Sequence, residues 1–255
     1  CIDYRKVNSN TKKDAYPMPL IEDCLALCKD AKWLSIIDVQ DAYYHVFMDV
    51  GSRAATAFVT SEGLFEWHVM PFGLCNAPAT FQRHVDTILR EYIGKICAAF
   101  FDDIVVFTNG TFDEHITHVE LILRKLASAK LSAKIKKCKF GYKELIFVGH
   151  LLREGKVFPD PAKLDAVSKW PEPTNVTELQ SFIGLVNYYR RFIDSFSMIA
   201  GPLHALTKKD APWVWSLSEK GAFEKLKSCL LTAPCLHGPD FKRPFILQTD
   251  ASIHG

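Results

Sequence analysis

The sequence predicts a mixed protein of short β-strands and amphipathic helices. Apolar runs rich in Ile, Val and Phe occupy residues 33–38 and 98–107, and runs of this length and composition are typical of strands. Apolar residues in 113–131 instead recur at helical spacing, and Pro78 suits the start of a helix over 79–91. The chain has 255 residues, of which 48% are hydrophobic and 24% charged, so it is globular and can bury a large core.

The rest of the chain is expected to continue this mixture. Proline-rich residues 170–173 separate two helical patterns, and Thr174 or Thr177 is the expected N-cap of the second. The other expected elements are a helix near 20–27, a hairpin over 145–158, helices over 160–169, 176–192 and 222–231, a linker over 201–217, and a strand beginning in 243–250.

Two adjacent carboxylates, Asp102 and Asp103, divide the apolar run 98–107 and fit the tip of a buried hairpin. Burying carboxylates is costly unless a cation or another partner offsets the cost. The obvious cation is a hard, oxygen-preferring metal such as Mg²⁺. An ordinary polar turn is the alternative, because Asp is common in turns.

A third acid, Asp38, ends the strand-like run 33–38. If the two runs are neighbouring strands, Asp38 and Asp102 converge at the surface of one sheet. Two such carboxylates could hold a pair of Mg²⁺ ions about 4 Å apart, as in phosphoryl-transfer sites. Alternatively, Asp38 caps the segment Val39–His45, and the spacing alone does not decide between the two.

The composition excludes several classes of protein. The formal net charge is only +2, so a nucleic-acid site must be a local patch. The eight cysteines contain no Cys-x-x-Cys pair, which indicates thiols in a reducing compartment and neither a zinc site nor a disulfide framework. No apolar stretch reaches membrane-spanning length. His115 and His118 could form a metal pair, but we expect ordinary surface or capping histidines because no third ligand is evident nearby.

Three motifs, in the right order, resemble those of reverse transcriptases. Phe100–Asp103 looks like the Tyr-x-Asp-Asp box, and Ser35–Tyr44 resembles the catalytic motif that precedes it. Met70–Arg83 is similar to the motif of long-terminal-repeat retrotransposon polymerases of the Gypsy/Ty3 group. Further matches are Ile2–Arg5, Lys137–Gly141, Phe147–His150 and Phe182–Ile193, so the resemblance to this part of a Pol polyprotein spans essentially the whole chain.

The resemblance implies a right-hand polymerase of the α+β class, whose palm is a small antiparallel sheet with helices on one face. It implies truncated fingers and palm over 1–152, a thumb or connection over 153–212, and the start of an RNase H-like domain over 213–255. Both ends look like cuts through a longer polyprotein, and basic finger residues are expected before residue 3. Asp250 would be the first acid of the RNase H site, but its partner acids would lie beyond residue 255, so RNase H activity is not expected here.

The implied activity is RNA-directed and DNA-directed DNA polymerisation, in which a primer 3′-hydroxyl attacks the α-phosphate of a deoxynucleoside triphosphate. Asp38, Asp102 and Asp103 would form the catalytic triad. Asp38, Asp102 and the carbonyl of Val39 would be ligands for two Mg²⁺ ions, with Mn²⁺ as a possible substitute. Asp103 would support the site electrostatically.

The resemblance also implies a nucleotide site beside the acids. Backbone amides of residues 39–42 would meet the triphosphate, and Gly73 would allow close backbone approach. The ring of Tyr43 would exclude a 2′-hydroxyl, although core packing is its alternative role. The implied nucleotide-binding residues are Gln40, Asp41, Ala42, Tyr43, Phe72 and Gly73. No role is assigned to Gln82 and Arg83 on the following helix.

Primer and template contacts are expected along the palm and thumb. The basic run from Lys134 to Lys139 would contact phosphates or donate a proton to pyrophosphate, or else form a solvated strand edge. Phe147–Leu151 resembles the primer grip, and Phe100 replaces the usual Tyr of the acidic box. The expected nucleic-acid contacts are Arg5, Phe100, Lys136, Lys137, Gly149, His150, Arg190 and Arg191.

The expected partners are a primed RNA or DNA template, deoxynucleotides and other Pol segments, with no membrane and a cytoplasmic or virus-like-particle location. The competing hypothesis is a catalytically inactive remnant that binds nucleic acid or polyprotein partners. The presence of all three acids favours retained catalytic design, because they are costly to keep without a metal.

Overall fold

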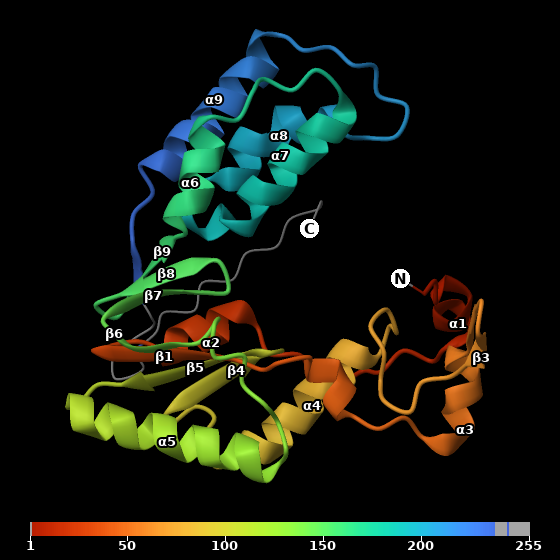
Figure 1. Cartoon of the computed structure of the whole chain (residues 1–255). Helices are drawn as coiled ribbons and strands as arrows, with labels where there is room; N and C mark the ends of the chain where they lie inside the picture. Colours follow the sequence, from red (N-terminus) through yellow and green to blue (C-terminus); the bar gives the residue numbers. More distant parts are fainter. Residues whose placement is uncertain (1, 238–243, 245–255) are drawn as a thin grey trace.

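The computed structural model describes residues 2–237 and residue 244 (Figure 1). The strand expected over 243–250 and Asp250 therefore lie outside the described residues. The helices are α1 (Arg5–Asn10), α2 (Ile21–Leu27), α3 (Val50–Arg53), α4 (Ala77–Leu89), α5 (Phe112–Ser128), α6 (Pro161–Ser168), α7 (Val176–Tyr188), α8 (Phe196–Leu206) and α9 (Leu217–Leu231), with 3₁₀ turns η1 (Ala42–His45), η2 (Ala54–Thr56) and η3 (Arg190–Phe192). The strands are β1 (Trp33–Asp38), β2 (Phe58–Thr60), β3 (Gly63–Phe65), β4 (Cys97–Phe100), β5 (Asp103–Thr108), β6 (Lys139–Tyr142), β7 (Glu144–Phe147), β8 (His150–Arg153), β9 (Lys156–Pro159) and β10 (Leu236–His237).

A four-stranded antiparallel sheet in the order β4-β5-β1-β6 forms the centre of the molecule. The predicted hairpin is confirmed: β4 pairs with β5, and Phe100 opposite Asp103 leaves only Phe101 and Asp102 in the turn. β1 pairs with β5 from Trp33 opposite Thr108 to Asp38 opposite Asp103. The end of β1 and the tip of the hairpin therefore coincide.

Both faces of this sheet are covered, so the expectation of helices on one face only was wrong. On one face, Ile37 and Ile104 are fully buried in a cluster with α4 and α5 residues. On the other, Leu34 and Ile36 are buried in a cluster that includes Leu25 of α2 and residues of the second sheet. Because side chains alternate along a strand, a continuous apolar run supplies core to both faces.

The segment expected as a hairpin over 145–158 is a longer meander. β7, β8 and β9 pair in sequence, and β10 adds a fourth strand beside β9. Gly149 and Gly155 lie in the two connecting turns with φ of 64° and 69°, a backbone region that glycine enters at little cost.

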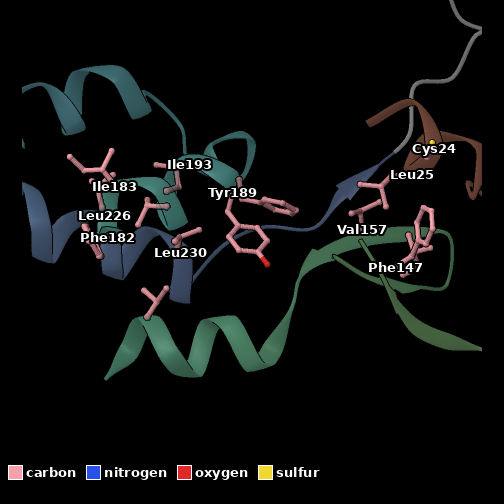
Figure 2. Close-up of a cluster of buried hydrophobic side chains, with 14 of the residues drawn as sticks. Cys24, Leu25, Phe147, Val157, Phe182, Ile183, Tyr189, Ile193, Leu226 and Leu230 are labelled. Atoms are coloured by element: carbon pink, nitrogen blue, oxygen red, sulfur yellow. The ribbon is translucent and has the colours of Figure 1, made fainter. Parts of the chain in front are cut away.

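Helices α6 to α9 form a bundle above the second sheet (Figure 1). Its core includes Phe182 of α7 and Phe223 of α9, whose ring centroids are 4.5 Å apart. Figure 2 shows this cluster extending through Tyr189 towards Leu25 and Phe147. The Tyr189 hydroxyl also donates to the Gly149 carbonyl over 2.7 Å, so the bundle is fixed to the β7–β8 turn.

Three boundaries in this bundle differ from expectation. α8 continues through Pro202 to Leu206, inside the expected linker, because Ala200 and Leu203 are buried and their packing outweighs the low helix propensity of proline. α9 begins at Leu217 because Ser216 and Glu219 form a capping box. The N-cap of α7 is Asn175, whose side chain accepts from the Glu178 amide at 3.0 Å. The expected caps, Thr174 and Thr177, do not have this role.

A smaller unit packs beside the central sheet and contains α1, α3 and the two-stranded β2–β3 sheet (Figure 1). The buried Tyr4 connects its parts by donating to the Thr56 carbonyl over 3.1 Å. The expected border after residue 152 falls inside β8, and the expected domain limits stay predictions. Among the helices of the described residues, none has the length and apolar character needed to cross a membrane.

Candidate active site

The structure brings Asp38, Asp102 and Asp103 together at the tip of the β4–β5 hairpin. Asp38 and Asp103 are directly paired residues of β1 and β5. The Val39 amide donates to the Asp102 carbonyl over 2.9 Å, which fixes the turn against the end of β1. Asp38 does not cap the segment that follows, because residue 41 precedes η1 and no side-chain cap is formed there.

A buried glutamine supports the same turn from the opposite side. Gln82 of α4 is fully buried, and its Oε1 accepts from the Phe101 amide over 2.7 Å. Phe101 has a φ of 54°, a left-handed conformation that costs a residue with a side chain about 1 kcal/mol or more. The sequence motif contained Gln82, but only the structure shows what its amide contacts.

A lysine far away in sequence neutralises part of the acidic cluster. The Lys137 ammonium lies 2.9 Å from Asp38 Oδ2, and the Asp38 side chain is only 10% exposed. The hydrogen bond and charge of Asp38, with smaller contributions from Asp102 and Asp103, raise the pKa of Lys137. Lys137 is therefore held in the protonated form beside Asp38.

The acids also repel one another. Burial, followed by the charges of Asp102 and Asp38, raises the pKa of Asp103 to about 6, while Lys137 opposes the shift. Desolvation and a shared negative field are the ordinary causes of such a rise in a carboxylate. The cluster is thus predisposed to take up positive charge near neutral pH.

Aromatic rings form a wall beside the acids. Tyr43 lies 5.0 Å from Phe72 and 5.9 Å from the buried Phe81, measured between ring centroids. Burial first, and then the charge of Asp102, raises the pKa of Tyr43. Tyr43 therefore packs against the buried Phe81 and lies near enough to Asp102 for that charge to act on it, whereas Phe72 is 54% exposed. Gly73, beyond Phe72, has a φ of 95°.

The loop after β1 offers fewer phosphate-binding amides than expected. The amide of Val39 donates to Asp102, and that of Gln40 donates to the Ser132 carbonyl over 2.7 Å. The expectation that both would meet a triphosphate was therefore wrong. The amides of Asp41 and Ala42 are the candidates in this loop, and Asp41 has a left-handed φ of 48° that reverses the chain there.

The expected nucleic-acid residues fall into separate places. Arg5 lies at the start of α1, where it forms an exposed pair with Asp3 at 2.6 Å. Phe100 packs edge-on against Phe101 beside the acidic turn, and Lys136 is exposed next to Lys137. Of this expected set, Lys137 contacts Asp38, and Phe100 directly precedes the acidic turn.

The remaining expected contacts cluster around the β7–β8 turn. His150 is only 6% exposed, and its Nδ1 lies 2.8 Å from the Val148 carbonyl, so it supports the turn from inside. Gly149 lies under Tyr188, whose hydroxyl donates to the Val148 carbonyl over 2.7 Å. Arg190 and Arg191 are exposed on η3, and with His150 and Phe100 they line a pocket of about 420 Å³.

One expectation about histidines was wrong. His115 is 1% exposed and is neither a surface nor a capping residue. Its ring nitrogens lie 2.7 Å from Ser35 Oγ and 2.9 Å from Thr108 Oγ1, and burial lowers its pKa to about 4. Ser35 also accepts from the Gly141 amide over 2.9 Å, so this network joins α5, β1 and β6. The sequence feature that could have indicated this buried network is Ser35, a polar residue inside an otherwise apolar strand.

The donors at the acidic cluster suit a hard divalent cation. Asp38 and Asp102 provide carboxylate oxygens, and the Val39 carbonyl lies beside them in sequence. Across residues 2–237 there is no ready-made cluster of three metal-binding His, Cys, Asp or Glu side chains. Mg²⁺ is commonly held by one or two carboxylates together with substrate phosphates and water, and Asp38 and Asp102 are two carboxylates of that kind.

The antiparallel sheet with acids at its hairpin tip, flanked by α2, α4 and a helical bundle, is the architecture of a right-hand polymerase. Residues 1–152 match the family model described as reverse transcriptase (RNA-dependent DNA polymerase). Residues 215–255 match that of an RNase H-like domain found in reverse transcriptase. The chain belongs to the reverse transcriptase family.

Curated relatives are transposon polyproteins of the Gypsy/Ty3 type. The chain is 40% identical over 252 residues to the retrovirus-related Pol polyprotein from transposon 297 of Drosophila melanogaster, covering 98% of this chain and 24% of that protein. It is 36% identical over 251 residues to the transposon Tf2-3 polyprotein of Schizosaccharomyces pombe (strain 972 / ATCC 24843), covering 98% and 19%. The chain thus spans about a quarter or less of these relatives.

Solved structures of foamy viral protease-reverse transcriptase share the fold. One, in complex with double-stranded DNA, is 27% identical with a TM-score of 0.85, covering 93% of this chain and 42% of that one. Another, in complex with an RNA/DNA hybrid, is 26% identical with a TM-score of 0.81, covering 92% and 32%. The right-hand polymerase fold predicted from the sequence is confirmed.

The raised pKa of Asp103 predicts a specific dependence of stability on pH. Between about pH 4 and pH 6 the folded state holds a proton that the unfolded state has released, so this group makes stability fall as pH rises. Without divalent metal, Asp103→Asn should exceed the wild type in free energy of unfolding by about 1 kcal/mol at pH 7.5, after discounting for partial exposure, and this gain should disappear below pH 4. Urea denaturation at each pH measures it.

The exposed Asp194→Asn serves as the control and should track the wild type at every pH. A difference between Asp103→Asn and the wild type that is constant across pH would contradict the raised pKa.

Proposed function

We propose that this chain is the polymerase core of a retroelement Pol polyprotein, which extends a primer on an RNA or DNA template by nucleotidyl transfer. The observation that carries the proposal is the convergence of Asp38 with the 102–103 turn, since Asp38 and Asp103 come from separate strands and are paired in register. Membership of the reverse transcriptase family and the nucleic-acid complexes of the structural relatives support it.

Asp38, Asp102 and the Val39 carbonyl are proposed to hold two divalent ions, with Mg²⁺ as the preferred metal. Bound metal would supply charge neutralisation on the phosphates and would make the primer 3′-hydroxyl more acidic. Asp103 adds negative potential without direct coordination. The Val39–Asp102 hydrogen bond keeps the two ligands in a fixed relation, so little reorganisation is needed when charge develops.

The incoming deoxynucleotide is proposed to lie between the acids and the exposed ring of Phe72. Its triphosphate would approach the amides of Asp41 and Ala42, beside Gln40. Gly73, whose left-handed φ admits no side chain without strain, lets the chain turn close to the nucleotide. Its sugar would pack on Tyr43, whose ring Phe72 and Phe81 hold in place.

Primer and template are proposed to run from the acids across the β7–β8 turn to the exposed guanidinium groups of η3. Tyr188 and Tyr189 hold the backbone of that turn through hydrogen bonds of 2.7 Å each. Arg190 and Arg191 project beside it, although Arg191 also pairs with Glu22 at 3.7 Å. Contacts of this kind position a backbone and carry no sequence preference.

Substitution of one acid tests the proposal most simply. Asp102→Asn keeps the size of the side chain but removes the charge that holds the metal, so primer extension on RNA with Mg²⁺ should fall by about 10³-fold or more. The assay uses this chain and the longer polyprotein segment that carries it, with the exposed Asp194→Asn as control. Equal rates for Asp102→Asn and the wild type would contradict the site.

A wild type that binds primed template but shows no response to Mg²⁺ would point instead to the non-catalytic remnant.

Tyr43 predicts discrimination against ribonucleotides. Removing its ring in Tyr43→Ala removes the clash with a 2′-hydroxyl, so the preference for deoxynucleotides over ribonucleotides should fall about 10-fold, equivalent to about 1.4 kcal/mol. Single-nucleotide incorporation measures the ratio, and Tyr142→Ala on the exposed edge strand β6 is the control. An unchanged ratio with reduced stability would assign Tyr43 to core packing alone.

Lys137 predicts an effect on the chemical step. Its ammonium lies at Asp38 and is therefore placed to move to the pyrophosphate leaving group and donate a proton as charge develops. Lys137→Met should lower kcat by about 10²-fold with a smaller change in the KM for deoxynucleotide. Lys163→Met, an exposed lysine of α6, is the control. A rise in KM alone would reassign Lys137 to substrate binding.

A further inference from the structure

We propose that Gln82 is a positioning residue that sets the conformation of the acidic turn and thereby the position of Asp102. This role deepens the proposed function and rests on it, because the turn matters only if Asp102 acts on the reaction. Gln82 comes from α4, which follows the loop that carries Phe72 and Gly73. It is fully buried, so its amide has no access to solvent water.

Both the oxygen and the nitrogen of the Gln82 side-chain amide form hydrogen bonds. Its Oε1 accepts from the Phe101 amide at 2.7 Å, while its Nε2 donates to the Ala99 carbonyl at 3.2 Å and to Asp86 Oδ1 at 2.9 Å. One side chain thus holds β4 just before the turn and the turn itself. A buried polar group without partners would cost about 1–3 kcal/mol, so the side chain and the turn depend on each other.

The turn needs such support because its backbone is strained. Phe101 is the first of the two turn residues, and a φ of 54° at that position favours glycine. Its amide is the very group that Gln82 binds. On the other side, Asp102 receives the Val39 amide. The two hydrogen bonds hold consecutive residues of the turn, one through Gln82 of α4 and one through Val39 directly after β1. Neither of them involves the Asp102 carboxylate.

A second tier of contacts holds Gln82. Asp86 Oδ2 accepts from the Tyr16 hydroxyl at 2.6 Å, which raises the pKa of Tyr16. Arg83 lies 4.7 Å from the Tyr16 ring centroid and pairs with Asp14 at 2.6 Å. The motif residues Gln82 and Arg83 therefore have different contacts. Gln82 points inward and binds the acidic turn, whereas Arg83 contacts Asp14 and Tyr16 of the N-terminal segment.

The test compares Gln82→Met, which keeps the length of the side chain and loses all three hydrogen bonds, with Gln82→Glu, which keeps an acceptor for the Phe101 amide. For Gln82→Met, kcat should fall about 10- to 100-fold, with less than about a threefold change in the KM for deoxynucleotide, because a misplaced ligand weakens the chemical step. The Mg²⁺ concentration for half-maximal rate should rise. Gln82→Glu should retain more activity than Gln82→Met. Gln180→Met, on the exposed face of α7, should match the wild type.

Hydrogen–deuterium exchange at the Phe101 amide separates this inference from the proposed function. Exchange should be faster in Gln82→Met than in the wild type, whether or not the protein polymerises. Equal protection of the Phe101 amide in both proteins would contradict the inference that Gln82 holds the acidic turn. Faster exchange with wild-type kcat and Mg²⁺ dependence would overturn the positioning role. If the wild type is inactive but exchange is faster in Gln82→Met, the proposed polymerase function would be contradicted. The inference that Gln82 holds the acidic turn would still stand.

Discussion

The pairing register between β1 and β5 is the constraint on which the site depends. A shift of one residue would turn every side chain of β1 to the opposite face, which would move Ile37 out of its cluster with α4 and α5 residues and carry Asp38 away from its place opposite Asp103. The apolar clusters on both faces of the sheet oppose any such shift. The core therefore does more than stabilise the fold, because it determines which carboxylates meet at the hairpin tip.

That geometry places like charges close together, and contacts with surrounding residues partly offset the resulting electrostatic repulsion and backbone strain. Lys137 pairs with Asp38, while Asp103 has its pKa raised to about 6 mainly by burial. The strained residue Phe101 is held by Gln82. The ion pair with Lys137 and the hydrogen bond with Gln82 stabilise the cluster in the free protein, whereas the buried Asp103 keeps an electrostatic cost that a bound cation would reduce. Structural strain and electrostatic repulsion are thus concentrated at one turn, as is common at functional sites.

The acids within the apolar run 98–107 predicted the hairpin tip, whereas convergence with Asp38 followed from the residues only if the two runs were neighbouring strands, and the motif resemblance was needed to expect it. The sequence also predicted the polymerase fold through motif order. It did not predict the partners of those acids: Lys137 lies 99 residues from Asp38, and no local pattern encodes that distance. His115 was misjudged because it lies on α5 while its partners, Ser35 and Thr108, lie on β1 and β5. Helix α8 persists through Pro202 because packing outweighs propensity.

Counting the ions held at the acidic cluster tests the central claim most directly. Electron paramagnetic resonance can titrate Mn²⁺ into the wild type and Asp38→Asn, each with a primed template whose 3′ end is blocked and with the matching deoxynucleotide. If Asp38 and Asp102 share the metals, the wild type should bind two strongly coupled ions and Asp38→Asn should lose at least one. Identical Mn²⁺ binding by the two proteins would contradict the assignment of Asp38 to the metal site.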